Sequence, residues 1–558
     1  MIHDQDNSLS KISGLLSALK ENTLTPTGTF DSAAADSFLT TTLNQDSPVK
    51  IPKTLQAVFD EIPGSGKDRQ AGAVRLVRVL LDSAQGYEKA HGCPVPADVL
   101  HQALHSAYST TRAGLRGIYD SAAANSLMSD PQGLQSNRAI VAIMTAFAEA
   151  IPFAHYLPAD ISSNKATLAI MNHLAGKTYG AYAQNALMDG VLSGDCYISA
   201  ARTHQCAIAA GVCTGKLTTI QSNPVTCDPA APGIKTLRGR SIVYVNGMVA
   251  AKEVNSSGSG TSVVAGSTTI AGTAYSFSGS INSDTGVISL TTSPQIPVTA
   301  EVIVEGFVDY ERQPELVPSI ISAVQTYELL ASPWRVNTFQ TIDSRTQMAN
   351  ELGLDPYSES VIAIQNQFAN ERHYNVLRKA KRIAANKTTD YDFNWSARSS
   401  QLNRYAIWKD CAALLGSISQ QMAIDTMSHG VSHLYVGKSI MSEFRALPPD
   451  MFEQSGVWER PGIFRVGRFL SQYDVYYEPG RILTETATTA QILCVGRAPE
   501  VTRNPFVLGD AVAPIIQPLA VGGDLNTGAG FYARNFTEVN PHPPSSMGCS
   551  LLNVINLH

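Results

Sequence analysis

Residues 332–342 read SPWRVNTFQTI, and they lead within a few residues into the segment that decides the fold. Their β-branched and aromatic residues, with a proline near the start, predict an extended strand. Gly353 then ends a short helical run, Asp355 can cap free backbone amides, and Pro356 suits the first helical position, which needs no amide hydrogen. These signals predict that a helix begins at residue 355.

The helix predicted over residues 355–386 is long for a globular protein. Apolar residues recur along it at helical spacing from Val361 to Ile383. At 1.5 Å per residue it would be about 45 to 50 Å long. Periodicity alone is also typical of a surface helix with one buried stripe. The C-terminal half carries cations, which suit the negative end of the helix dipole: Arg372, Arg378, Lys379, Lys381 and Arg382.

Length and charge limit the function classes. A chain of 558 residues is too long for one ordinary core, so we expect two to four structural units. With 41 Lys and Arg against 47 Asp and Glu, the net charge is −6, which argues against binding duplex DNA as the main task. Only 16% of the residues are charged, a composition that suits a protein that buries much of its surface against neighbours.

The eight cysteines do not indicate a disulfide scaffold in so long a chain, and no CxxC pair points to zinc or redox chemistry. We expect free, buried thiols, while a local or inter-subunit bridge among Cys196, Cys206, Cys213 and Cys227 stays open. The N-terminus carries acids where a signal peptide has positive charge, and no apolar run is long enough to span a membrane. The expectation is a soluble protein of a cytoplasm.

Residues 237–312 change to a β pattern. Asn246-Gly247 stands between two apolar runs and predicts a hairpin with a type I′ turn. A second hairpin is predicted over residues 279–290, and a strand over residues 302–310 closes the set. Asp284 is the only charged residue between Glu253 and Glu301.

This neutral segment is interpreted either as a flat contact surface or as an exposed β insertion. We expect its edge strands to be free to pair with a neighbouring subunit.

The order of motifs resembles one protein family. YELLA at 327–331 and QMANELGLD at 347–355, followed by the long helix, are similar to the spine region of tailed-bacteriophage major capsid proteins, above all those of contractile-tailed phages. The later motifs follow the order of that family: VSHLYVG at 431–437, YYEP at 476–479, ILCVGR at 492–497, residues 504–518, and FYARNF at 531–536. The resemblance covers roughly residues 120 to 540. Glu478 departs from it, since the family usually has Asp, and the usual Tyr before Pro518 is missing.

The resemblance implies an α+β, HK97-like capsid fold with an N-terminal helical extension and a β-rich insertion. The implied regions are an N-terminal extension (1–118) that could clasp neighbouring subunits, an N-arm (119–165), an E-loop region with a β-hairpin insertion (166–312), a P-domain (313–400) with its spine helix (355–386), an A-domain (401–500), and a return to the P-domain with a C-terminal tail (501–558).

The function that the resemblance implies is mechanical. Copies of the chain would self-assemble into hexamers, and into pentamers if the same protein fills the vertices, to form an icosahedral head shell. The shell would enclose double-stranded DNA without sequence-specific binding, with portal, scaffolding and decoration proteins as further partners and no membrane. The protein would be a virion component assembled in the bacterial host cytoplasm, with no enzymatic activity and no cofactor.

Two alternatives stay open: another phage structural protein, such as a tail sheath or baseplate component, and a metal-dependent hydrolase. For the hydrolase, His101 and His105 are one helical turn apart, as in a zinc protease, but the required Glu is Gln102, so solvated helix histidines are expected. His204 with Cys206 and Cys213 fits no zinc spacing.

A phosphate loop is also not predicted. Residues 64–68, GSGKD, have Glu61 where the first glycine would stand and Asp68 in place of the magnesium-binding Ser or Thr. The sequence therefore yields no catalytic, cofactor-binding or metal-binding residue.

Overall fold

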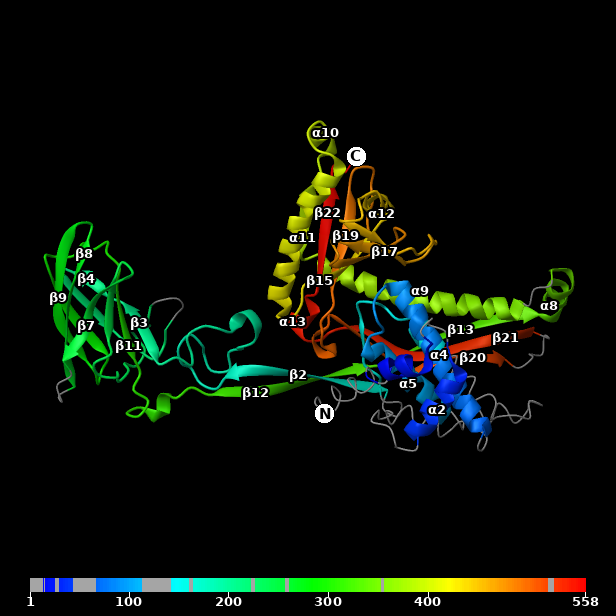
Figure 1. The fold of residues 1–558 in the computed structure, drawn as a ribbon, viewed down its shortest axis with the longest axis horizontal. Coiled ribbons are helices and arrows are strands. Elements are labelled where there is room, and N and C mark those ends of the chain that lie inside the picture. Colours follow the sequence, from blue (N-terminus) through cyan, green and yellow to red (C-terminus); the bar gives the residue numbers. More distant parts are fainter. Residues whose placement is uncertain are drawn as a thin grey trace. The chain divides into compact units, whose positions relative to one another are not determined.

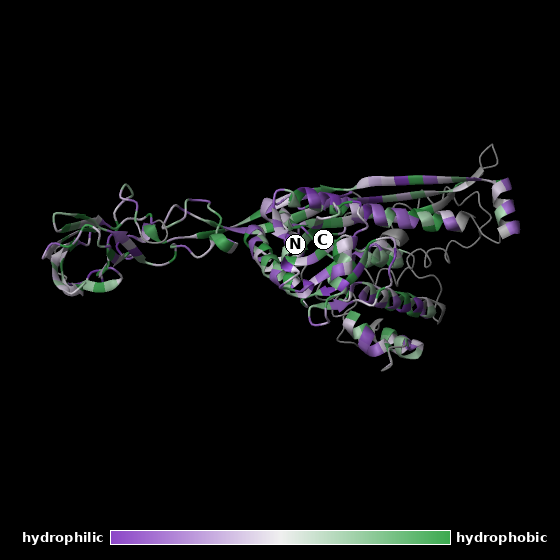
Figure 2. Cartoon of the chain, turned by 90° about the horizontal axis from the view of Figure 1, so that it is seen from above, coloured by the Kyte–Doolittle hydropathy of each residue, from purple (hydrophilic) through white to green (hydrophobic). Residues whose placement is uncertain are grey.

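A long helix, α9 (Pro356–Ala384), is the central element of the computed structural model. It follows strand β13 (Ser332–Thr341), the short helix α8 (Ile342–Gln347) and the π-helical turn η3 (Met348–Leu352). Ile364, Phe368 and Leu377 of its predicted apolar stripe are buried. The predicted strand and long helix are both confirmed, and Figure 2 shows hydrophobic and hydrophilic residues alternating along the helix.

The structure describes residues 14, 16–25, 30–43, 67–112, 142–159, 164–221, 226–255, 260–352, 356–519 and 526–557. The proposed cap Asp355 lies outside this part, as do residues 119–141 and 160–163 of the predicted N-arm. The chain divides into unit 1, residues 1–170 and 326–558, and unit 2, residues 171–325. In the part of the chain described, no helix is long and apolar enough to cross a membrane.

The α9 helix packs on a four-stranded sheet of unit 1 with the order β1-β20-β21-β13 (Figure 1). The strands besides β13 are β1 (His155–Tyr156), β20 (Phe506–Leu519) and β21 (Asn526–Val539). Phe368 of α9 contacts Trp334 and Phe531, with ring centroids 5.2 and 5.0 Å apart. These aromatic contacts fix α9 along β13 and β21.

The other face of this sheet is covered in part by a two-stranded sheet of β2 (Lys165–Ala175) and β12 (Ile320–Leu330). Leu168 and Leu329 pack there against Val507 and Phe536. Val507 follows Phe506, which packs in the core on the α9 side, and successive side chains of a strand point to opposite faces. Through β2 and β12 the chain leaves unit 1 and returns to it.

A second sheet of unit 1 has seven strands in the order β14-β22-β19-β15-β18-β17-β16. Their bounds are β14 (Thr388–Asp392), β22 (Cys549–Ile555), β19 (Ala490–Gly496), β15 (Val431–Val436), β18 (Tyr473–Tyr477), β17 (Phe464–Phe469) and β16 (Phe452–Gln454). Helix α11 (Arg404–Thr426) packs on this sheet, and Asn403 caps it by accepting the Ala406 amide at 3.0 Å. Helix α12 is Lys438–Arg445.

The C-terminal strand corrects one expectation. Residues 501–558 were predicted to return to the P-domain and then end in a tail. Strands β20 and β21 do lie in the four-stranded sheet, but β22 lies between β14 and β19 in the seven-stranded one. The reason is its composition, because the apolar side chains of Leu552 and Val554 are buried in the core of that sheet.

The N-terminal helices pack against α9. Helices α2 (Ser32–Leu43), α4 (Lys67–His91) and α5 (Ala97–Arg112) belong to the predicted N-terminal extension. Leu76 and Leu80 of α4 and Leu104 of α5 share a core with Tyr374 and Leu377 of α9. Contact of the extension with neighbouring subunits stays a prediction. The apolar stripe of each helix finds its partner within the chain, so the described part of the extension belongs to unit 1. Residues 142–148 form a further helical segment of unit 1.

Unit 2 holds a nine-stranded sheet with the order β3-β11-β6-β7-β8-β9-β10-β5-β4. Its strands are β3 (Ala201–Gln205), β4 (Ala207–Ala209), β5 (Val212–Lys216), β6 (Ile242–Val245), β7 (Met248–Asn255), β8 (Thr261–Ile270), β9 (Thr273–Asn282), β10 (Val287–Ser293) and β11 (Val302–Phe307). The φ angles of Asn246 and Gly247, +46° and +79°, confirm the type I′ hairpin.

The prediction that this region has edge strands free to pair with a neighbouring subunit is wrong. The two terminal strands of the order, β3 and β4, are consecutive in the chain and are joined at Cys206, so the sheet closes on itself. The Cys206 amide donates to Val302 O at 2.8 Å and continues the ladder across the joint. Closure removes the edges that a neighbouring strand would need. Contacts of unit 2 with other molecules would therefore be made by side chains.

Candidate functional site

The residues considered for metal or phosphate chemistry have structural roles where the structure describes them. His101 and His105 lie on α5 and are half-buried rather than solvated as expected, and burial lowers the pKa of His101. Gln102, which replaces the catalytic Glu, is buried and donates its amide to Asp510 Oδ2 at 3.0 Å. This hydrogen bond joins α5 to β20.

The cysteine cluster does not form a metal site. All eight cysteines are free and six of them are buried, while Cys93 and Cys196 are half-buried. Burial raises the pKa of Cys206 to about 12, which disfavours the thiolate that a metal needs. Within the described ranges, no three His, Cys, Asp or Glu side chains are close enough together to hold a metal ion. Residues 64–66 of the phosphate-loop pattern lie outside those ranges.

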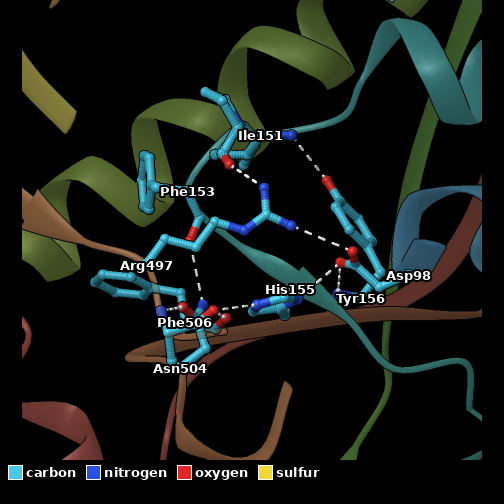
Figure 3. A network of polar contacts seen from close by, with 10 residues as sticks. Asp98, Ile151, Phe153, His155, Tyr156, Arg497, Asn504 and Phe506 are labelled. Atoms are coloured by element: carbon cyan, nitrogen blue, oxygen red, sulfur yellow. Dashed lines mark hydrogen bonds and ion pairs between the residues drawn. The ribbon is translucent and has the colours of Figure 1, made fainter. Parts of the chain in front are cut away.

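A buried polar network joins α5 to the four-stranded sheet (Figure 3). We call Asp98, His155, Arg497 and Asn504 the Asp98 network. Asp98 Oδ2 lies 3.1 Å from His155 Nδ1, and its Oδ1 lies 3.2 Å from Arg497 Nη2. Arg497 Nη1 donates to Pro152 O at 2.6 Å, and Asn504 Nδ2 donates to Phe153 O at 3.1 Å. The network thus ties four separate segments of unit 1 together.

The charge state of Asp98 follows from these contacts. Burial alone would raise the pKa of its carboxyl, but His155, Arg497 and the Tyr156 amide outweigh burial and lower this pKa to about 2. Asp98 is therefore an anion at any pH at which the protein is handled. No sequence motif indicated this role, because an acid in the first turn of a helix is ordinary.

A second buried ion group, the Arg372 cluster, joins α9 to β20. Arg372 of α9 is buried, with Nη2 2.9 Å from Asp510 Oδ1 and Nη1 3.9 Å from Glu149 Oε2. Burial raises the pKa of Glu149 to about 8, and Asp510 adds to the rise while Arg372 opposes it. The cation lies closer to Asp510 than to Glu149, and Glu149 is protonated at neutral pH.

This assignment predicts that the chain becomes less stable as the pH rises, and that the variant Glu149→Gln does not show this loss. In the folded chain Glu149 holds its proton up to about pH 8, whereas in the unfolded chain it loses it near pH 4.5. The contribution of Glu149 to stability is then full below pH 4.5 and is lost as the pH rises to 8. We expect the variant to be more stable than the unchanged chain by about 2 to 4 kcal/mol at pH 8, and this difference to be smaller at pH 6.5. Urea unfolding at both pH values measures this, and equal stabilities at pH 8 would contradict it.

A third group, the histidine cluster of His91, His373 and His433, lies where α4, α9 and the seven-stranded sheet meet. His91 Nδ1 is 3.0 Å from Tyr476 Oη, and His373 Nε2 is 2.9 Å from Tyr435 Oη. Burial is the main cause that lowers the pKa of His91 to about 4 and the pKa values of His373 and His433 to about 3. All three histidines are neutral at pH 7.

The outer edge of β13 differs from these buried groups because it is open. In the part of the chain described, β13 ends the sheet and pairs only with β21, in a register that runs without interruption from Ser332 to Thr341. Val336 is 44% and Phe339 69% exposed. The single charged residue of the strand, Arg335, stacks over the ring of Tyr532. We call this feature the β13 edge.

The β13 edge can bind an extended chain. No described strand pairs with the outer edge of this ten-residue strand, and no lysine or bulge protects that edge. Exposed apolar residues continue beyond the strand at Ile342 and Met348. The sequence predicted the strand correctly, but it could not indicate which edge of the sheet would be left open.

No protein-family model matches the chain. No curated protein matches it either.

Among solved structures, the chain is similar to that of the jumbo bacteriophage PhiKZ capsid, with 9% identity, a TM-score of 0.38, and 72% of this chain and 91% of the other covered. It is similar to the capsid of Myoviridae phage XM1, with 5% identity, a TM-score of 0.28, and 43% and 78% covered. It is also similar to the SrpI encapsulin complex of Synechococcus elongatus, with 10% identity, a TM-score of 0.27, and 43% and 79% covered.

Proposed function

We propose that this chain is a major capsid protein with an HK97-like fold, and that its copies assemble into the icosahedral head shell that encloses packaged phage DNA. The observation that carries the proposal is the β13 edge. A protein that functions as a monomer rarely has a long, flat, unprotected strand edge with exposed apolar side chains. A shell subunit needs such surfaces because each of its contacts with neighbours buries them.

The architecture of unit 1 supports the same function. Its longest described helix, α9, has 29 residues and is about 44 Å long at 1.5 Å per residue. In the proposal α9 and the four-stranded sheet form the P-domain of the shell wall, and the seven-stranded sheet with α11 forms the A-domain. Strands β2 and β12 with unit 2 form the E-loop region, which contacts an adjacent subunit.

Three buried groups hold unit 1 together: the Asp98 network, the Arg372 cluster and the histidine cluster. They connect α4, α5, α9 and both sheets. Rigid subunits joined by many weak interfaces give a closed shell that is hard to open. Portal, scaffolding and decoration proteins are further proposed partners, and contact with DNA is without sequence preference.

Electron microscopy of the purified chain tests the proposal. Spherical shells, or rings of five or six copies, support it. Tubes would point to a tail sheath, and a strictly monomeric chain at all protein concentrations would refute an assembly role. The same preparation can be assayed for bound zinc, whose presence in one-to-one ratio would favour a hydrolase instead.

Phe339→Glu should block assembly without unfolding the chain. The Phe339 side chain is 69% exposed, so the substitution costs the monomer little, but it places a charge in a contact that has to exclude water. We expect the yield of assembled particles to fall about tenfold or more, with an unchanged melting temperature. Val298→Glu is the matched control, because Val298 is 75% exposed in unit 2 and lies outside any strand. Equal loss of particles in both variants would contradict a specific role of the β13 edge.

A further inference from the structure

Arg202 of β3 is a buried cation without a buried anion. Its side chain is 0% exposed. Nη1 donates to Ser199 O at 2.8 Å and to Ala201 O at 2.7 Å. Among the residues that the structure describes, Nε and Nη2 have no hydrogen-bond partner. Arg202 forms no ion pair with any described carboxylate.

The surroundings of Arg202 supply only partial negative charge. The guanidinium carbon lies 4.4 Å from the centre of the Tyr179 ring. A ring face attracts a cation, but it does not replace a counter-ion. A buried cation is costly unless an anion offsets it, so the pocket favours any nearby group that can become negative.

Cys196 lies beside this cation, with its Sγ 3.1 Å from Arg202 Nη1. Within the described part of the chain, its own hydrogen has Ala201 O as acceptor at 3.6 Å, which is a long contact. Cys227, the other thiol of this region, is buried, donates to Thr203 O at 3.0 Å, and has its pKa raised by burial. Cys196 is half-buried, so small reagents can reach it.

We propose that Cys196 is the reactive thiol of this chain, and that it undergoes thiol–disulfide exchange with small disulfides. Arg202 is a positioning residue, because its Nη1 lies 3.1 Å from the sulfur and holds it in place for attack. The Cys196 thiolate attacks one sulfur of the small disulfide, whose S–S bond breaks. A mixed disulfide forms at Cys196, and the other half leaves as a thiolate that takes up a proton from solvent. The small disulfide is the oxidant, so the step is balanced.

The chain provides a matched control. Cys93 is the other half-buried cysteine, but burial raises the pKa of its thiol, and the remaining six cysteines are buried. If exposure alone governed reactivity, Cys93 and Cys196 would react at similar rates. If Arg202 governs it, Cys196 reacts first.

The test uses the full chain and dithiodipyridine, an aromatic disulfide whose released thiopyridone absorbs in the near ultraviolet. At neutral pH we expect Cys93→Ser to keep a fast phase about tenfold faster than any phase left in Cys196→Ser. Peptide mapping should place the first mixed disulfide on Cys196. A fast phase that survives in Cys196→Ser would overturn the proposal.

Two variants separate the role of Arg202 from a purely structural one. Arg202→Gln should slow the Cys196 reaction about tenfold, and Arg202→Lys, which keeps a positive charge, should restore most of the rate. An unchanged rate in a folded Arg202→Gln chain would refute the positioning role. If that variant does not fold, the comparison of Cys93→Ser with Cys196→Ser decides the proposal.

Discussion

At about pH 4.5, unit 1 should be largely unfolded because the histidine cluster takes up protons. In the unfolded chain a histidine binds its proton near pH 6.5, whereas in the folded chain His91 binds one only near pH 4 and His373 and His433 near pH 3. The unfolded state therefore binds more protons below pH 6.5, and stability is lost as the pH falls from 6.5 toward 4.

The expected loss is about 2 to 3 kcal/mol for each histidine between pH 6.5 and 4.5. Three such losses together are comparable to the whole stability of a typical domain. Burial is the first cause for each histidine, and Arg465 and Arg460 beside His91 oppose its protonation further.

His373→Phe tests the assignment. Phenylalanine fills the same space between Phe153 and Tyr435 and cannot take up a proton. We expect the midpoint of acid unfolding to move to lower pH, as followed by circular dichroism. The control is His173→Gln, because His173 lies in unit 2, is exposed and pairs with Asp189 at 2.7 Å. A midpoint that moves as much in the control as in His373→Phe would show that the cluster does not govern acid unfolding.

The second large effect is expected for Arg497→Met, which should lower the free energy of unfolding by about 3 to 5 kcal/mol. The substitution removes the guanidinium partner of the buried Asp98 anion and leaves Pro152 O without its donor. Arg398→Met is the control, because its pair with Asp410 is exposed and should be worth less than about 1 kcal/mol.

A double-mutant cycle with Asp98→Asn separates the pair from the packing. Once the anion is gone, Arg497→Met should cost much less than it does alone. Additive costs would mean that Arg497 acts through its contact with Pro152 rather than through Asp98. Guanidinium or urea unfolding of the four chains provides the measurement.

How much the sequence could predict depended on the range of the interaction. The α9 helix was predicted within a few residues because its signals are local: a glycine that ends the preceding run, a proline at the start, and apolar spacing. The Asn246-Gly247 hairpin was predicted for the same reason, since the turn requires positive φ angles that these two residues tolerate. The α+β class follows from such elements.

Interactions between distant segments were not predictable. Gln102 and Asp510 are 408 positions apart, and nothing in either neighbourhood indicates the hydrogen bond that joins them. Asp98 and Arg497 are similarly remote. The placement of β22 and the closure of the unit 2 sheet depend on which strand finds which partner, and periodicity within a strand does not encode that choice.

The chain enters unit 2 through β2 and leaves it through β12, and these two strands are hydrogen-bonded neighbours. Gly176 N donates to Ser319 O at 2.7 Å just inside unit 2, so the entry and exit points are adjacent. When the two ends of an insertion are adjacent, the surrounding fold has to accommodate only that one connection point. Unit 2 can thus be shortened, replaced or loaded with a foreign sequence while the surrounding fold is kept, which makes it the natural place to graft a peptide for display.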